Sequence, residues 1–209
     1  MSASAIEGSG EEVEDLLHAL SRLGEPDGTF SYLRLSTRPV AQNLANVPKD
    51  EKARNFRRKN VHSGGYRLRD SSDDHGLSPS VALVGAGAVM PEVIRAAELL
   101  EEEGGIGADV ICLTSYDLVF RALRARQGLD ENGEYSILET LFPESRKLPI
   151  VSVIDGHPHS LAFLGGIQTV GQTCLGVADF GQSGDVDDLY EHYGIDAETI
   201  IGAALDAIG

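Results

Sequence analysis

Short apolar segments alternate with helix-like segments through most of this 209-residue chain. Continuous apolar runs of strand length are typical of parallel strands that are covered on both faces. The alternation therefore predicts an α/β fold with a mostly parallel sheet. The strand patterns lie at residues 81–84, 108–113, 149–154 and 175–180. The helical patterns lie at residues 91–102, 117–126, 134–141, 159–165, 186–193 and 197–208. We interpret the helical segment at 134–141 as a candidate lid.

The net charge of −16 is divided unevenly along the chain. Between Arg34 and Arg69 lie ten Lys or Arg residues but only two acids, so this segment carries +8 and the remainder −24. An acidic body disfavours nucleic acids and membranes as partners. The most basic part of this segment, residues 49–59, contains Phe56 as its one interleaved aromatic residue, which favours a solvated or acid-paired linker over a nucleic-acid arm. We interpret the asymmetry as an electrostatic clamp, either within the chain or between subunits.

Cys112 and Cys174 stand in separate apolar runs and lack the spacing of a zinc site. Two buried thiols are typical of a reducing compartment, so we expect a cytoplasmic protein. The longest apolar stretch, residues 81–100, contains three charged residues and is not expected to span a bilayer.

We expect four segments along the chain. Residues 1–10 are small and polar and are expected to form a disordered tail. Residues 11–37 combine a helical pattern at 11–22 with a strand pattern at 30–36. Residues 38–63 contain two prolines and many charges, which predicts an extended basic linker with room for one short helix. Residues 64–209 hold the α/β pattern.

Gly85-Ala86-Gly87 follows a predicted strand and resembles the glycine-rich turn of dinucleotide-binding proteins. Met90 replaces the third glycine of that motif, and no acidic residue ends the next strand. We therefore expect a tight turn between a strand and a helix in preference to a nucleotide site. The backbone amides of such a turn can still receive an anion.

Asp155-Gly156-His157-Pro158-His159 is the most chemically suggestive cluster. It follows a predicted strand at the edge where α/β proteins place their ligands. His157 and His159 with a nearby acid are ligand types of a zinc site, but no third ligand stands at a suitable spacing. We expect a hydrogen-bonded turn that caps the following helix and lies at a subunit interface. Because imidazoles titrate near neutral pH, such an interface would be pH-sensitive.

The closing loop runs from Phe180 through Gly181-Gln182-Ser183-Gly184-Asp185. It breaks the G-x-S-x-G nucleophile motif, because Asp185 stands where the second glycine is required. Ser183 or Asp185 is instead expected to cap the helix at 186–193. We expect no catalytic, cofactor-binding or metal-binding residue in this chain. The candidate interface or loop residues are Asp155, His157, His159, Phe180, Ser183 and Asp185.

The order of these motifs resembles the carboxy-terminal domain of transketolase-like, thiamine-diphosphate-dependent enzymes. The resemblance implies a three-layer sandwich around a mixed sheet, with one antiparallel edge strand at Tyr66. Residues 27–39 also look like the last strand of a pyrimidine-binding domain and the start of a linker. Among such enzymes, the chain therefore most resembles single-chain pyruvate dehydrogenase first components. The motifs that carry the resemblance are Gly64-Gly65-Tyr66-Arg67-Leu68, the strand at 81–84 with Gly85-Ala86-Gly87, the strand at 108–111 with Thr114-Ser115, and the ending at Phe180-Gly181-Gln182-Ser183-Gly184 with Gly194-Ile195-Asp196.

The resemblance also implies where the cofactor is bound. In such enzymes a Gly-Asp-Gly motif and a later asparagine hold the metal and the diphosphate, whereas here Gly184-Asp185 is followed by Val186. We therefore expect that this chain alone binds neither thiamine diphosphate nor magnesium. A partner chain would carry the diphosphate- and pyrimidine-binding domains, and this chain would be a fragment or the product of a split gene.

The leading hypothesis is a non-catalytic carboxy-terminal part or subunit of a thiamine-diphosphate-dependent 2-oxo acid dehydrogenase of the pyruvate type, or of a transketolase-like enzyme. The complete enzyme would decarboxylate a 2-oxo acid or transfer a two-carbon unit. This part would support a dimeric or higher assembly and the architecture of the active site. One alternative is a stand-alone binding or regulatory module that kept the fold without the chemistry. Another is a nucleotide-binding enzyme at the Gly85 turn.

Overall fold

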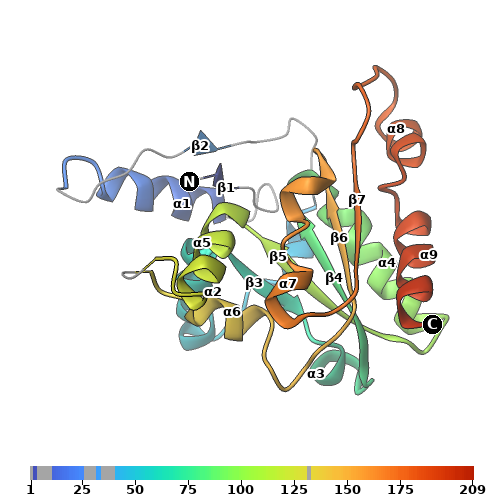
Figure 1. Ribbon diagram of the computed structural model, residues 1–209, viewed down its shortest axis with the longest axis horizontal. Helices are drawn as coiled ribbons and strands as arrows, with labels where there is room; N and C mark the ends of the chain where they lie inside the picture. Colours follow the sequence, from blue (N-terminus) through green and yellow to red (C-terminus); the bar gives the residue numbers. More distant parts are fainter. Residues whose placement is uncertain (1, 4–10, 26–31, 34–40, 131–132) are drawn as a thin grey trace.

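A computed structural model of the chain describes residues 2–3, 11–25, 32–33, 41–130 and 133–209. Its centre is a five-stranded sheet in the order β3-β5-β4-β6-β7 (Figure 1). β3 pairs with β5 in the antiparallel direction, and the other neighbours are parallel. This arrangement confirms the predicted mixed sheet with one antiparallel edge strand. The strands are β3 (Gly65–Arg69), β4 (Pro79–Ala86), β5 (Gly107–Leu113), β6 (Ile150–Ile154) and β7 (Gln172–Gly176).

Helices cover both faces of the sheet, which makes three layers (Figure 1). Strand residues alternate between the two outer layers, because successive side chains of a strand point to opposite faces. Leu83 thus belongs to the first core and Val84 to the second. The first core lies under α4 (Met90–Glu102) and α9 (Ala197–Ile208), and the second lies under α5 (Tyr116–Arg126), α6 (Ser136–Leu141) and α7 (Gly165–Gln168).

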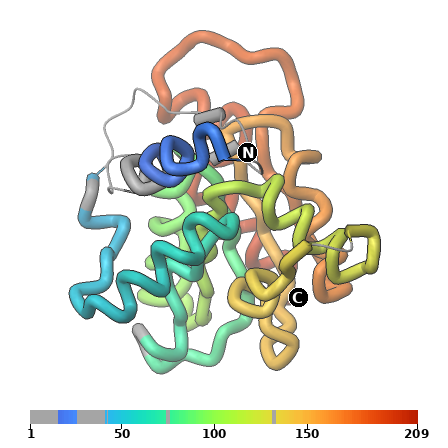
Figure 2. The backbone as a smooth tube through the Cα atoms, turned by 90° about the vertical axis from the view of Figure 1, so that its left-hand side faces the viewer, coloured from blue at the N-terminus to red at the C-terminus, as the bar shows by residue number. Residues whose placement is uncertain are grey.

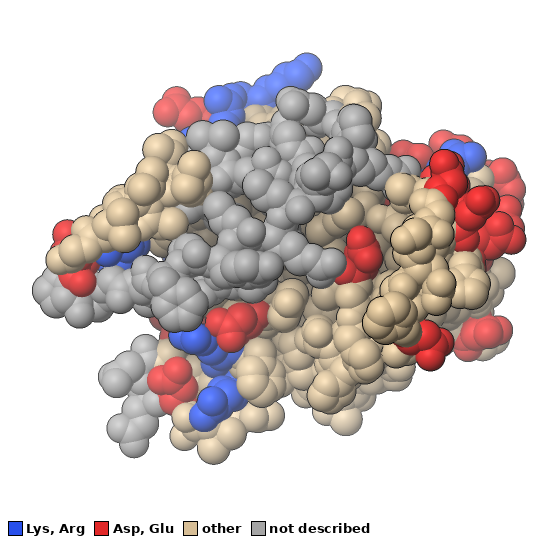
Figure 3. All heavy atoms as spheres, turned by 90° about the horizontal axis from the view of Figure 1, so that it is seen from above, with Lys and Arg blue, Asp and Glu red and all other residues tan. Residues whose placement is uncertain are grey.

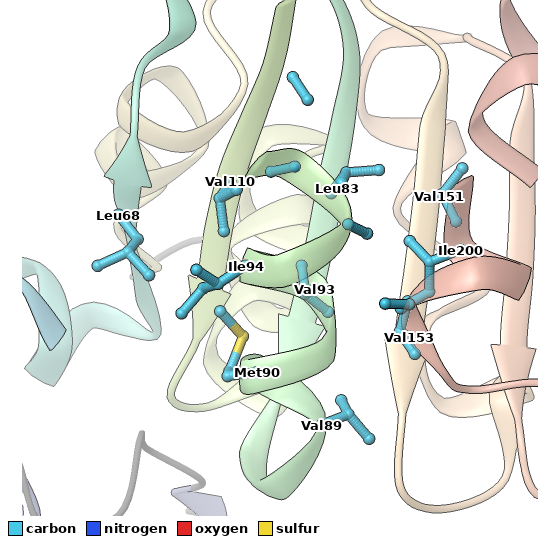
Figure 4. Close-up of a cluster of buried hydrophobic side chains, with 14 of the residues drawn as sticks. Leu68, Leu83, Val89, Met90, Val93, Ile94, Val110, Val151, Val153 and Ile200 are labelled. Carbon is cyan, nitrogen blue, oxygen red and sulfur yellow. The ribbon is translucent and has the colours of Figure 1, made fainter. Parts of the chain in front are cut away.

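The first core is built on the central strand β4. Leu83 lies opposite Val110 of β5 and Val151 of β6, so three apolar side chains form a row across the sheet. Val93 of α4 and Ile200 of α9 pack against the same cluster (Figure 4). All five side chains are fully buried. Burial of such a side chain contributes about 1.5–3 kcal/mol, so this row holds both helices on the sheet.

The amino-terminal part contains the predicted helix, α1 (Glu11–Ser21). Two short strands, β1 (Ser2–Ala3) and β2 (Tyr32–Leu33), pair in parallel. The rest of the predicted tail at 1–10 and of the predicted strand at 30–36 lies outside the described residues. The division of the chain into four segments stays a prediction.

The described part of the predicted linker, residues 41–63, holds more regular structure than the extended chain with one short helix that its sequence predicted. A 3-10 turn, η1 (Gln42–Ala45), precedes a long helix, α2 (Glu51–Ser63). Asp50 caps this helix, because its carboxylate accepts a hydrogen bond from the backbone N–H of Ala53 at 2.8 Å. The expectation of an extended chain was therefore wrong for this segment.

Contacts with the rest of the fold explain why α2 forms. Arg57 donates a hydrogen bond to the carbonyl of Ala45 at 2.6 Å, and its guanidinium lies 4.6 Å from the centroid of the Tyr66 ring. Val61 is buried in the first core. Because the sequence of α2 shows no regular apolar stripe, these tertiary contacts were hidden from sequence reasoning.

Two further expectations differ from the structure. α6 is no lid, since Ile137, Leu138 and Leu141 are at most 5% exposed and belong to the second core. The predicted helix at 159–165 is divided into a 3-10 turn, η3 (Pro158–Leu161), and α7. No helix among the described residues combines the length and the apolar character that a bilayer crossing requires.

An acidic side chain lies fully buried in β5. One carboxylate oxygen of Asp109 accepts hydrogen bonds from the backbone N–H and the hydroxyl of Ser71, both at 3.1 Å. The other oxygen accepts from Arg67 of β3 and from Arg146, the latter at 2.9 Å. A buried charge is tolerated when it is paired and hydrogen-bonded in this way. The contacts join β3, β5, the start of α3 (Ser71–His75) and the loop before β6.

We predict that Asp109→Asn lowers the free energy of unfolding by about 3–5 kcal/mol, because breaking a buried ion pair leaves an uncompensated charge. Urea unfolding followed by circular dichroism measures the change. Glu102→Gln, on the exposed side of α4, is the matched control and should change stability by less than about 0.5 kcal/mol. Equal stability of the two variants would contradict the role given to Asp109.

Asp70 belongs to the same network, and its titration makes the fold sensitive to acid. Arg146 donates to its carboxylate at 2.6 Å, and the backbone N–H of Ser72 donates at 3.0 Å. Partial burial by itself raises the pKa of Asp70. The hydrogen bonds from Arg146 and Ser72, and the charges of Arg146 and Arg67, outweigh it and bring the pKa below the usual 3.8.

Because the folded-state pKa of Asp70 is depressed, its stabilising contribution is present above pH 3.8 and is lost as the pH falls through the lower folded-state value. We predict that Asp70→Asn reduces the loss of stability on acidification from about pH 5 to pH 2. Urea midpoints measured across this range test the prediction. Asp73→Asn, at an exposed site in α3, the helix that Asp70 caps, should keep the wild-type pH dependence. A wild-type pH dependence in Asp70→Asn as well would refute it.

Candidate functional site

The parallel strands β4, β6 and β7 end at the same edge of the sheet, toward the top of Figure 1. The chain leaves β4 toward β5 on one side and returns to β6 on the other. The edge between β4 and β6 is therefore a topological switch point, where open α/β sheets bind their ligands.

A hollow of about 300 Å³ lies at this edge, beside α8 (Val186–Tyr193). Its walls come from the turn after β4, the end of β6, the loop after β7, and α8 with the residues that follow it. Two polar side chains reach the wall, Asp155 and Gln182. The larger apolar and aromatic side chains of the wall are Val177, Val186, Leu189, Tyr190, Tyr193 and Ile195.

The turn after β4 is the tight strand-to-helix turn that the sequence predicted. A Cβ atom at Gly85 would lie 2.5 Å from the sulfur of Met90, so only glycine lets α4 approach this closely. Gly87 has a φ of +78°, a left-handed conformation that glycine adopts without strain. The turn, η2 (Gly87–Val89), places Ala88 in the wall of the hollow.

Asp155 is the first residue after β6, and its side chain is half-buried. The loop that carries it is held against the end of β7. The carbonyl of Gly156 accepts a hydrogen bond from the backbone N–H of Val177 at 2.8 Å. A Cβ atom at Gly176 would lie 2.6 Å from the same carbonyl oxygen, so the two backbones are in close contact.

His157 and His159 form the capping turn that the sequence predicted. Nδ1 of His157 accepts a hydrogen bond from the backbone N–H of His159 at 3.2 Å and caps η3. Both side chains are exposed, and their ring centroids are 6.3 Å apart. Within the described ranges, no three His, Cys, Asp or Glu residues gather as a metal site. The subunit-interface role of these histidines stays a prediction.

The last strand does not lie where the sequence placed it. β7 covers residues 172–176 instead of 175–180. Its side chains are only half-buried because it forms an edge of the sheet, so it lacks the apolar run that marks the inner strands. The chain after Val177 forms an exposed loop between β7 and α8 (Figure 1).

The exposed loop carries Phe180, which is 91% exposed. The Tyr193 hydroxyl donates a hydrogen bond to the Phe180 carbonyl at 2.9 Å and so ties the loop to the end of α8. Asp185 caps α8 by accepting from the backbone N–H of Asp187 at 3.2 Å. Ser183 lies in the exposed loop. Of the two predicted caps, Asp185 is the one that the structure uses.

α2 and α8 lie on opposite sides of the molecule, and they differ in charge. Figure 2 faces the side that carries α2, whereas α8 lies on the far side. Acidic side chains gather on the α8 side in Figure 3, and α8 itself exposes Asp187, Asp188 and Glu191. Lys52 and Lys59 of α2 are exposed and form no ion pair with any described residue. α2 and α8 of one chain therefore form no clamp, but the basic segment does pair with acids of its own chain through Arg67 with Asp109 and Arg69 with Glu101. A clamp between subunits stays a prediction.

A family model for the transketolase-like C-terminal domain matches residues 64–196, which is more than half of the chain. The chain belongs to this family. Among curated proteins, a chloroplastic transketolase of Craterostigma plantagineum is 28% identical over 148 residues, which are 71% of this chain and 25% of the relative. The pyruvate dehydrogenase E1 component of Escherichia coli strain K12 is 27% identical over 156 residues, which are 69% of this chain and 16% of the relative. The chain thus spans a quarter or less of these relatives.

Solved structures show the same fold as this transketolase-like domain. Transketolase from Leishmania mexicana has a TM-score of 0.63 at 15% identity, and the match covers 99% of this chain and 25% of that one. A split-gene transketolase, described as an inactive tetramer of four beta subunits, has a TM-score of 0.62 at 17% identity. The match covers 99% of this chain and 57% of that one.

The wall of the hollow in this transketolase-like domain does not fit the diphosphate of thiamine diphosphate. A diphosphate is negatively charged, whereas the wall presents the carboxylate of Asp155 and no Lys or Arg among the described residues. No step of a reaction is therefore assigned to the hollow.

Sequence reasoning singled out Asp155 but missed the residues of α8 that face it. Leu189, Tyr190 and Tyr193 follow the i, i+1, i+4 spacing of one helix face, which was a usable signal. The contacts of this face of α8 depend on the path of the loop between β7 and α8. The sequence did not show that path, because the end of β7 was misplaced.

We predict that Tyr193→Phe increases the motion of residues 178–184, because it removes the hydrogen bond to the Phe180 carbonyl, which contributes about 0.5–1.5 kcal/mol. NMR order parameters of the loop amides should fall, while those of the sheet stay constant. Tyr116→Phe, on α5, is the control and should leave the loop unchanged. Unaltered order parameters in Tyr193→Phe would show that this bond does not hold the loop.

Proposed function

We propose that this domain is the non-catalytic carboxy-terminal part or subunit of a thiamine-diphosphate-dependent 2-oxo acid dehydrogenase of the pyruvate type, or of a transketolase-like enzyme. The observation that carries the proposal is its membership of the transketolase C-terminal family while it spans only 16% to 25% of the curated relatives compared above. Its role would be to support the assembly and the active-site architecture of a complex with a partner chain.

The partner would hold thiamine diphosphate and magnesium. Bound thiamine diphosphate supplies a stabilised carbanion for cleavage of the bond beside a carbonyl. Two observations support a location in the partner: this chain lacks a Gly-Asp-Gly motif, and the acidic hollow does not suit a diphosphate. We also place the protein in the cytoplasm, which its two free thiols, Cys112 and Cys174, support.

The exposed face of α2 is the surface that we assign to the partner. Lys52, Phe56 and Lys59 recur at i, i+4 and i+7 and therefore share one side of the helix. Phe56 is 59% exposed, and the lysines on either side of it are not paired with any described carboxylate. An exposed aromatic side chain flanked by cations fits an acidic protein surface, with the lysines at the rim of the contact.

The experiment that tests the proposal isolates the tagged chain from its native host. The co-purifying protein should contain Gly-Asp-Gly. The two chains together, with thiamine diphosphate and magnesium, should decarboxylate pyruvate or transfer a two-carbon unit. Neither chain alone should do so. Full activity of the partner without this chain would overturn the subunit role.

We predict that Lys52→Glu combined with Lys59→Glu weakens binding of that partner at least about tenfold and reduces its salt dependence. Surface plasmon resonance at several salt concentrations provides the measurement. Lys147→Glu, on the loop before β6, is the matched control, because its surface pair with Glu144 contributes little. Equal losses in the control and the α2 variant would argue against a contact through α2.

The alternative of a stand-alone binding module is favoured by the hollow itself, which lies where α/β sheets bind ligands. The same isolation experiment separates the two functions. A chain that purifies alone from its native host, with a small molecule bound, would favour the binding module.

A further inference from the structure

We propose that the hollow at the carboxyl edge of the sheet binds a small organic ammonium ion with a compact apolar body. The inference goes beyond the assembly role proposed above, because it assigns a ligand to the domain itself. It rests on the chemistry of the wall and on the charge around its mouth.

The carboxylate of Asp155 is the group that would bind the cation. It is half-buried in the wall, and it forms no hydrogen bond or ion pair with any described residue. Its oxygens are not among the described buried side-chain atoms that lack a hydrogen-bond partner, so they are open to a cation that enters the hollow. An ammonium group provides both the missing donors and the opposite charge.

Gln182 provides a second acceptor in the wall of the hollow. The Gln182 side chain donates its amide N–H to the Phe180 carbonyl at 3.4 Å, so its amide oxygen remains as an acceptor. The Tyr193 hydroxyl donates to the same carbonyl and is thereby already used as a donor. The Asp155 carboxylate and the Gln182 amide oxygen thus give the wall two acceptors, which favour a donor such as an ammonium ion.

The rest of the wall selects the body of the ligand. Val177, Leu189 and Ile195 offer apolar surface, and Tyr190 and Tyr193 add aromatic rings, which attract organic cations. The volume of about 300 Å³ is at the lower end of ligand sites, so the apolar body must be small.

The surrounding charge favours the same class of ligand. Asp185, Asp187 and Asp188 are exposed at the start of α8, next to the loop that borders the hollow. A cluster of carboxylates raises the local concentration of cations and repels anions such as phosphates. The ligand would thus meet an attractive field before it reaches Asp155.

The test is an NMR titration of the full ¹⁵N-labelled chain with benzylamine. The amide signals of Asp155, Val177 and Leu189 should shift and saturate. Benzyl alcohol, which has the same ring without the charge, should bind at least about tenfold more weakly, and benzoate should not bind. Equal binding of benzylamine and benzyl alcohol would overturn the proposal.

Variants test the assignment to Asp155. Asp155→Asn should weaken benzylamine binding at least about tenfold, and Gln182→Leu, in the exposed loop, about threefold. Asp188→Asn, which removes a charge on α8 outside the wall, is the control and should change affinity less than about twofold. Wild-type affinity in Asp155→Asn would overturn the site. If Asp155→Asn fails to fold, wild-type affinity in Gln182→Leu would overturn it in the same way.

A last arm identifies the source of the ammonium group. An acetylated peptide with one central lysine is compared with benzylamine. Tighter binding of the peptide assigns the hollow to a lysine side chain of another protein, whereas tighter binding of benzylamine assigns it to a free amine. Both results support an ammonium site. The titration uses this chain alone, so a lack of benzylamine binding would not contradict the proposed assembly role. Likewise, a failure to isolate a partner chain would not contradict the ammonium site.

Discussion

Burial of β4 on both faces is the constraint on which the rest of the structure depends. Leu83 and Val84 point to opposite layers, so helices must cover both sides of the sheet. The chain satisfies this requirement by placing β5 on one side of β4 and β6 on the other. The same arrangement separates the loops that follow β4 and β6 and so creates the switch point at which the hollow lies.

Two carboxylates at different places on the sheet show how the fold distributes charge. Asp109 is fully buried, and its four hydrogen bonds come from Ser71, Arg67 and Arg146, so it serves the fold. Asp155 is half-buried and has no partner among the described residues. A buried charge is tolerated when it is paired and hydrogen-bonded, whereas a half-buried carboxylate without a protein partner in a concave site is open to a ligand.

Sequence reasoning succeeded where local patterns and burial agree. The inner strands β4, β5 and β6 are apolar because both of their faces are covered, and α8 has its polar cap at Asp185. It failed where tertiary contacts replace a local pattern. α2 depends on Arg57 and Tyr66, and β7 is an edge strand whose half-buried residues do not form an apolar run.

The sequence by itself determined the fold class, the family resemblance with its antiparallel edge strand, and the capping turn at His157, because each follows from local patterns or from their order along the chain. Only the tertiary structure decided that Asp155 shares a hollow with α8, that Phe180 is exposed, and that α2 and α8 lie on opposite sides of the molecule. These features join residues that are distant along the chain. Their positions depend on how the sheet and its helices pack, which no local pattern records.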